Sequence, residues 1–183
     1  MYKYARCYFY VSIISYTPKL GDLLRAERAK KDSKNGQMID SYIKEGKIVP
    51  AIVTVNLLKD AMEANAKAGK SIFLIDGFPR SEENLQNWLE NMSGLSENKG
   101  CLFLDCPEDV MTDRLLERGK TSNRSDDNIE SMRKRFSTYQ KDTMPIVQWF
   151  EGQNKLIRVI ADRSPEEVYE DIISKIFLLY FKE

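Results

Sequence analysis

The pentapeptide Asp76-Gly77-Phe78-Pro79-Arg80 combines residue types that can handle a phosphate. The Asp76 carboxylate can reach a metal-bound water, Gly77 lets a ligand approach the backbone, and the planar guanidinium of Arg80 matches a phosphate through two parallel hydrogen bonds. A plain turn between a strand and a helix, with a surface arginine, has the same composition. The pentapeptide therefore becomes informative only together with the other arginines of the chain.

A second polar segment runs from Gly119 to Asp126, between two stretches of helical pattern. Its polar, glycine-containing composition is typical of a movable flap. The arginines in and around it are Arg118, Arg124 and Arg135, and Arg25 lies in another short motif, G-D-L-L-R at 21–25. Taken alone, Arg133-Lys134-Arg135 would be the solvated face of a helix.

The composition excludes several other chemistries. The 183 residues contain 28 basic and 28 acidic side chains, so no field of one sign exists to bind nucleic acid or an anionic membrane nonspecifically. No histidine is present, which excludes Ser-His and Cys-His catalysis. Cys7, Cys101 and Cys106 have no second cysteine at ligand spacing, so zinc and iron–sulfur sites are not expected. Three cysteines also indicate a reducing compartment.

Short apolar runs separated by helical patterns indicate the fold class. The runs Ser71–Ile75, Cys101–Leu104 and Leu156–Ile160 predict strands buried on both faces, and hence an α/β fold with a parallel sheet and flanking helices. The first two runs lead into Asp76 and Asp105, and such sheets bind ligands outside the carboxyl ends of their strands. The length corresponds to about one domain.

Local signals predict where several helices begin. Ser164-Pro165-Glu166-Glu167 predicts a capping box with Pro165 at the first helical position. Pro107 is expected at the first helical position after the second apolar run. A helix that starts near Ile129 is expected to be interrupted near Pro145.

Six motifs occur in order between Gly21 and Ile176: G-D-L-L-R, D-S-x-x-G-x-x-I, E-G-K-I-V-P, L-I-D-G-F-P-R, E-R-G-K-T-S-x-R-S-D-D-N and K-R-F. In these motifs the chain resembles the nucleoside monophosphate kinases of the adenylate kinase superfamily, and within them the UMP/CMP kinases with a short lid. The resemblance implies transfer of the γ-phosphoryl group of Mg-ATP to a nucleoside monophosphate. In such transfer the protein mainly positions the substrates and stabilises charge.

The resemblance also implies residues for the monophosphate. Arg25 and Arg80 resemble the arginines that bind its phosphate, and Asn84 the amide that reads its base. Adenylate kinases usually carry Gln at that position, so a pyrimidine is favoured over AMP. The residues expected along the sugar, the base and the adjoining turn are Lys47, Ile48, Val49, Gly77, Phe78 and Pro79.

For the second nucleotide and for the transfer step, the resemblance implies a further set. Arg118 matches a lid residue against ATP, and Arg163 a position whose backbone lies near the adenine. Arg124 and Arg135 match arginines that face the phosphates during transfer. Asp76 resembles a carboxylate near the hydration shell of Mg²⁺, which arrives with ATP and takes no direct protein ligand. The monophosphate-binding part would cover about 22–52, the lid about 118–128, and the kinase domain 21–183.

Residues 1–20 depart from the family pattern. The family begins with a strand, a phosphate-binding loop of the form G-x-P-G-x-G-K-G-T and a helix, whereas no glycine precedes Gly21 here. Lys19 is the nearest candidate for the loop lysine, but Thr17-Pro18-Lys19-Leu20 lacks the glycines that turn consecutive N–H groups toward phosphate. Tyr8–Ile14 is expected to fill the place of the family's central strand, between Ser71–Ile75 and Cys101–Leu104. A secretory signal fits the segment less well, because no clear small-residue cleavage site follows it.

The expected function is therefore a UMP/CMP kinase of pyrimidine nucleotide metabolism, acting on ATP with UMP, CMP or dCMP. A monomer in the cytoplasm or nucleus is expected, with neither nucleic acid nor membrane as a partner. Two alternatives stay open: a non-catalytic relative that retains monophosphate binding, and an inactive fragment from an altered transcript start. A membrane-tethered interaction domain using residues 1–20 is a third.

Overall fold

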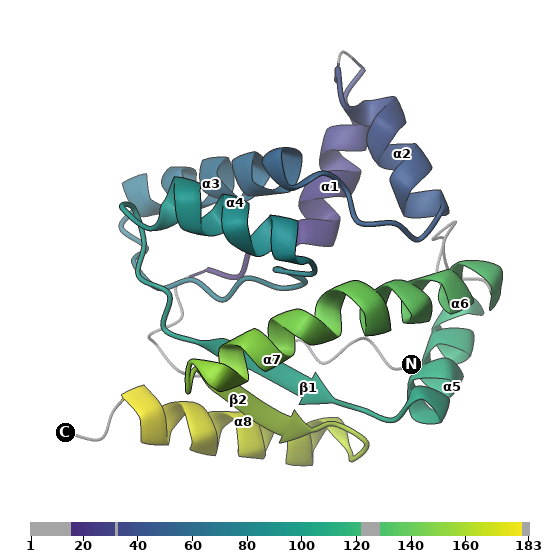
Figure 1. The fold of residues 1–183 in the computed structure, drawn as a ribbon, viewed down its shortest axis with the longest axis vertical. Coiled ribbons are helices and arrows are strands. Elements are labelled where there is room, and N and C mark those ends of the chain that lie inside the picture. The colour runs from purple at the N-terminus through teal and green to yellow at the C-terminus, as the bar shows by residue number, and fades with distance from the viewer. Residues whose placement is uncertain (1–15, 32, 122–128, 181–183) are drawn as a thin grey trace.

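The computed structural model describes residues 16–31, 33–121 and 129–180. Helices surround a small parallel β-structure, as Figure 1 shows. The elements in chain order are α1 (Leu20–Ala29), α2 (Gly36–Lys44), α3 (Ala51–Lys67), α4 (Glu82–Met92), β1 (Cys101–Asp105), α5 (Glu108–Gly119), α6 (Ile129–Thr138), the π-helical turn η1 (Tyr139–Thr143), α7 (Met144–Gly152), β2 (Leu156–Ile160) and α8 (Pro165–Tyr180). The α/β fold class expected from the apolar runs is confirmed.

Strands β1 and β2 pair in parallel, with Cys101 opposite Leu156 and Asp105 opposite Ile160. The strands have helices on both faces because successive side chains alternate. Ile157 and Val159 pack on α8, while Cys101 and Leu156 contact the cluster that α7 contributes. In Figure 1 α7 and α8 accordingly lie on opposite sides of this pair. Two of the three predicted strands are confirmed.

The prediction of a continuous strand at Ser71–Ile75 is wrong. The segment is reduced to two isolated parallel bridges, Tyr16 with Phe73 and Lys19 with Asp76. Its partner is short because α1 begins at Leu20, and Pro18 has no N–H to donate to the ladder. Tyr16 and Lys19, just before α1, thus supply a paired edge. The expected strand Tyr8–Ile14 lies outside the described residues.

The helix starts follow their local signals with one exception. Ser164 and Glu167 form the predicted capping box: Glu167 N–H donates to Ser164 Oγ (3.3 Å), and Ser164 N–H donates to a Glu167 carboxylate oxygen (3.0 Å). Pro145 lies in the first turn of α7, directly after η1, which confirms the interruption. Pro107 is not the first helical residue, because its ψ of 149° is extended and α5 begins at Glu108.

The largest apolar cluster lies between α1, α2, α3 and α4, and its fully buried members include Ile39, Val55 and Leu58. Phe78 packs against this cluster, and its ring centroid lies 5.4 Å from that of Trp88. The core therefore holds the turn after Asp76 in place between α1 and α4. No helix among the described residues is long and apolar enough to cross a membrane.

Candidate functional site

The turn that follows Asp76 meets the start of α1. Leu20 N–H donates to the Asp76 carbonyl oxygen (3.1 Å), so α1 begins where the 73–76 segment ends. The Asp76 side chain is exposed at this edge. Gly77 has a φ of 81°, and the Phe78–Pro79 peptide bond is cis. The start of α1, which carries Arg25, and the turn that carries Arg80 are thereby brought together.

Both arginines expected to bind the monophosphate fold over a glycine. Arg80 Nε donates to the Gly77 carbonyl oxygen (2.7 Å), and a Cβ at Gly77 would lie 2.6 Å from Arg80 Nη2. A Cβ at Gly21 would lie 3.3 Å from Arg25 Nη1. Arg25 also forms an ion pair with Asp22, one helical turn earlier. A side chain at Gly77 would therefore displace the Arg80 guanidinium and strain the backbone, whereas a side chain at Gly21 would only require Arg25 to shift slightly.

Asn84 is buried in the first turn of α4, where its side chain is 1% exposed. The Ser81 hydroxyl caps the helix by accepting from Asn84 N–H (3.2 Å). The Asn84 Oδ1 accepts from the backbone N–H of Arg80 (3.2 Å), whereas Nδ2 has no hydrogen-bond partner. A buried donor without a partner is costly, by about 1–3 kcal/mol, and calls for an explanation. Here it leaves the two N–H donors of the Asn84 amide without a partner beside Arg80.

The turn between α2 and α3 carries Lys47, Ile48 and Val49. Val49 is buried in the main core, Ile48 is half-buried, and Lys47 is exposed. The ion pair between Lys47 and Glu45 (2.6 Å) raises the pKa of Lys47 and lowers that of Glu45. The Lys47 side chain is thus held by a solvent-exposed carboxylate, which a phosphate could replace.

Helix α6 packs on this turn and places Arg135 beside it. Thr138 Oγ1 donates to the Gly46 carbonyl oxygen (3.2 Å), and a Cβ at Gly46 would lie 3.3 Å from Arg135 Cγ. Just after α6, Thr143 Oγ1 donates to the Arg80 carbonyl oxygen (2.8 Å). Helix α6 and the η1 turn that follows it thus contact both the turn at Gly46 and the backbone of Arg80. Arg124 lies outside the described residues.

Arg118 and Arg163 lie near a different edge, beyond β2. Arg114, one turn before Arg118 on α5, donates from Nη1 to the Ala161 carbonyl oxygen (2.6 Å) and from Nη2 to that of Arg163 (3.2 Å). The Arg163 guanidinium donates to Asp171 (2.8 Å), and this bond lowers the pKa of Asp171. Arg114 was missed by sequence reasoning, although its spacing of four from Arg118 places both on one helix face.

Neither a metal centre nor a glycine-rich phosphate loop is formed by the described residues. They contain no group of three or more acidic or cysteine side chains that could hold a metal ion. Tyr16 to Lys19 is a paired edge leading directly into α1, with Pro18 buried. Its sequence also lacks the glycines that turn consecutive N–H groups toward phosphate.

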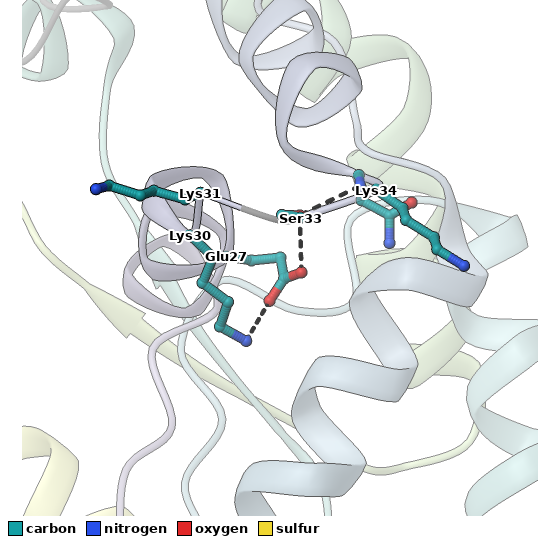
Figure 2. A pocket seen from close by; sticks show the side chains of 6 residues that line it. Glu27, Lys30, Lys31, Ser33 and Lys34 are labelled. Carbon is teal, nitrogen blue, oxygen red and sulfur yellow. Dashed lines mark hydrogen bonds and ion pairs between the residues drawn. The ribbon is translucent and has the colours of Figure 1, made fainter.

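A separate hollow of about 670 Å³ lies between the end of α1 and the start of α2. Within it Glu27 accepts from Lys30 Nζ (2.6 Å) and from Ser33 Oγ (2.9 Å), which lowers the pKa of Glu27. Figure 2 shows the Lys31 and Lys34 side chains directed away from this pair, on opposite sides. None of the residues expected to bind nucleotide lines the hollow.

Residues 11–155 match the family profile described as adenylate kinase. This chain belongs to the adenylate kinase family. It is 52% identical over 173 residues to a UMP-CMP kinase of Danio rerio, covering 93% of this chain and 88% of the relative. It is also 51% identical to a uridylate kinase of Saccharomyces cerevisiae (83% and 73% covered) and 46% identical to a UMP-CMP kinase of Homo sapiens (84% and 79% covered). The names of these relatives, UMP-CMP kinase and uridylate kinase, are those of nucleoside monophosphate kinases within the adenylate kinase family.

Proposed function

We propose that this chain binds UMP, CMP or dCMP in the region bordered by the start of α1, the turn before α3 and the start of α4. The observation that carries the proposal is the buried Asn84 amide, whose Nδ2 donor has no partner and whose Oδ1 is held by Arg80 N–H. The names of the relatives support a pyrimidine monophosphate as the ligand. As a kinase, the chain would transfer the γ-phosphoryl group of ATP to it.

Each residue of this region has a role in the proposed complex. Arg25 and Arg80 bind the α-phosphate, because their planar guanidinium groups can each donate two hydrogen bonds. Asn84 Nδ2 donates to an acceptor on the pyrimidine, such as the O2 that uracil and cytosine share. Lys47, Ile48 and Val49 border the sugar and base, and Gly77 to Pro79 shape the turn below the phosphate.

The same proposal assigns the transfer step to a second group. Arg124 and Arg135 stabilise charge on the transferred phosphoryl group, and Arg118 and Arg163 border ATP. Mg²⁺, when bound with ATP, neutralises the phosphate charge. Asp76 suits a contact through water, because it is a single exposed carboxylate at the edge where the phosphates would meet. We place the activity in a monomer of the cytoplasm or nucleus, with its monophosphate part at 22–52 and its lid at 118–128.

A second candidate function is monophosphate binding without transfer. The observation that favours it is the paired segment before Leu20, in which Pro18 is buried and Tyr16 and Lys19 pair with Phe73 and Asp76, together with a sequence in which no glycine precedes Gly21. Removing even one donor to a developing oxyanion slows a reaction by about 10²–10³. A chain without that loop is therefore expected to bind CMP and yet to transfer phosphate many orders of magnitude more slowly than the family.

Thermal unfolding of the 183-residue chain with CMP, UMP, AMP or Mg-ATP tests the binding proposal. CMP and UMP are expected to raise the melting temperature more than AMP or ATP, because a ligand stabilises through its affinity for the folded state. A coupled assay with CMP and Mg-ATP then separates the two functions. Turnover at about 1–100 s⁻¹ would establish the kinase and exclude the non-catalytic candidate. Equal protection by all four nucleotides would contradict both.

A further inference from the structure

The backbone of Arg80 is held at both of its polar groups by side chains. Asn84 Oδ1 accepts from the Arg80 N–H at 3.2 Å, and Thr143 Oγ1 donates to the Arg80 carbonyl oxygen at 2.8 Å. Asn84 lies four residues further along the chain, in the first turn of α4, whereas Thr143 lies 63 residues away, at the end of η1. One bond is therefore local, and the other depends on how two distant segments pack.

The Arg80 carbonyl lies outside the hydrogen-bond ladder of α4. The N-cap of this helix is Ser81, and its carbonyl oxygen accepts the first helical bond, from Leu85 N–H (3.1 Å). The N-cap residue is the first whose carbonyl a helix uses. The ladder of α4 therefore starts one residue too late to bond the Arg80 carbonyl, and Thr143 supplies a donor from another element.

A buried apolar contact fixes the place of Thr143 relative to α4. Ile146 and Phe150 of α7 pack with Leu85 of α4, and each of these three side chains is at most 4% exposed. Thr143 precedes Ile146 by three residues, and Leu85 lies near the start of α4. This contact therefore brings the residue before α7 to the start of α4, where the Thr143 hydroxyl meets Arg80.

A π-helical turn connects α6 to α7 and ends at Thr143. Met144 N–H donates to Tyr139 O, so this bond spans five residues instead of the four of an α-helix. Pro145 has no N–H, so an α-helical ladder could not continue through it. Turns of this kind inside a helix are frequent at functional sites. The position of Pro145 therefore places the irregular turn directly at Thr143.

The wider turn changes the direction of the Thr143 side chain. In a regular α-helix, residues five positions apart point about 140° away from each other. A turn with bonds between residues five apart brings such a pair nearer to one face. Thr138 and Thr143 accordingly both donate to backbone carbonyl oxygens of the proposed monophosphate region, at Gly46 (3.2 Å) and at Arg80 (2.8 Å). The π-helical turn thus lets one continuous helical segment hold both turns.

We propose that Thr143 is a positioning residue for Arg80, an inference that rests on the proposed function. The Thr143 hydroxyl holds the Arg80 carbonyl, so the backbone from which the guanidinium extends is fixed before a ligand arrives. Binding of a monophosphate then costs less conformational entropy at this arginine. Thr143 acts through the Arg80 backbone and makes no contact with the ligand.

Two substitutions at Thr143 separate its hydroxyl from its shape. Thr143→Val removes the donor and keeps the branched shape, whereas Thr143→Ser keeps the donor and lacks one methyl group. Thr112 offers a matched control, because its Oγ1 also donates to a backbone carbonyl oxygen at 2.8 Å, that of Glu108 within α5. Both threonines are half-buried. Thr112→Val therefore removes a bond of the same kind and length that does not involve Arg80.

Nitrogen-15 relaxation of the Arg80 Nε–H group tests the proposal in the chain without nucleotide, because its order parameter reports motion of this side chain. The order parameter is expected to fall in Thr143→Val and to keep its original value in Thr143→Ser and Thr112→Val. Thr143→Ala, which lacks the hydroxyl and cannot crowd its neighbours, carries the same expectation as Thr143→Val. An unchanged order parameter in the variants without the hydroxyl would overturn the proposal, and so would an equal fall in Thr112→Val.

Calorimetric titration with CMP then relates the position of Arg80 to binding. Thr143→Val is expected to raise the dissociation constant of CMP about threefold to tenfold, the factor that corresponds to one neutral hydrogen bond. Thr143→Ser should restore the affinity, and an unchanged affinity in Thr143→Val would overturn the proposal. Titration of the unaltered chain separately tests the proposed function. If CMP does not bind there, the monophosphate site is refuted, while the relaxation measurement still decides whether Thr143 positions Arg80.

Discussion

Asn84 Oδ1 accepts a hydrogen bond from the backbone N–H of Arg80 at 3.2 Å. This contact connects the residue proposed to read the base with the residue proposed to bind the phosphate. Asn84 is fixed by burial and by the N-terminal turn of α4, so its acceptor also fixes the backbone from which the Arg80 side chain extends. The positions of the Asn84 amide and the Arg80 backbone are therefore coupled. A ligand that contacts both residues binds to groups that are already held in place.

The free donor of Asn84 can be removed without removing its acceptor. In Asn84→Asp, one carboxylate oxygen still accepts from Arg80 N–H, but an oxygen replaces Nδ2. The new carboxylate oxygen then faces the pyrimidine oxygen, and both are acceptors. We therefore expect the dissociation constants of CMP and UMP to rise about tenfold or more at neutral pH. Isothermal titration calorimetry measures this change. Asn91→Asp, on an exposed turn of the same helix, is the control, and equal affinities for both variants would refute the role of Nδ2.

Replacing Arg80 should separate ligand binding from folding. Arg80 is exposed, and its Nε donates to the Gly77 carbonyl oxygen within the same turn, so Arg80→Ala should change the free energy of unfolding by less than about 1 kcal/mol. CMP affinity should fall strongly. Arg80→Lys should recover little of it, because the charge remains but the bidentate geometry is lost. Calorimetry and thermal unfolding supply the two readouts, with Arg133→Ala as an exposed control. A lower melting temperature with intact CMP affinity would show a structural role instead.

Gly77 tests how closely the turn and the arginine are packed. Gly77→Ala introduces a Cβ 2.6 Å from Arg80 Nη2 at a residue whose φ is 81°. Gly69→Ala places an alanine at a similar φ of 83° but with no atom within 4 Å of the new Cβ. Both variants should lose about 1 kcal/mol of stability from the left-handed backbone. Only Gly77→Ala should also weaken CMP binding, because the guanidinium must move, and an equal effect of the two on affinity would contradict this packing.

The capping box of α8 should contribute stability that depends on pH. The hydroxyl and backbone N–H of Ser164 both lower the pKa of Glu167 below its ordinary value of 4.5. A carboxyl whose pKa is lower in the folded than in the unfolded chain stabilises above the ordinary value, and this contribution is lost as the pH falls through the folded value. Ser164→Ala should therefore cost about 1 kcal/mol near neutral pH and less in acid. Urea unfolding at several pH values measures it, with the exposed Ser174→Ala as control; a cost that does not depend on pH would argue against the carboxylate.

Patterns that depend on neighbours in the chain were predictable from the sequence. The β1 and β2 runs, the Ser164–Glu167 cap and the irregular helix before Pro145 arise from periodicity, side-chain reach over one turn and the missing N–H of proline. The order of Asp76, Gly77 and Arg80 likewise makes this turn a candidate phosphate site, which stays a prediction. Short-range sterics and hydrogen bonding suffice for features of this kind.

Contacts between distant residues were decided only by the tertiary structure. The sequence could not show that the Arg114 guanidinium reaches the carbonyl groups of Ala161 and Arg163, or that α6 bonds to the turn at Gly46. The predicted strand at 71–75 became two bridges, because the extent of a strand depends on how many residues of its partner stay extended, and here α1 ends that partner at Lys19. Parallel pairing joins residues far apart in the chain, so its length and its open edges emerge only when the whole sheet is assembled.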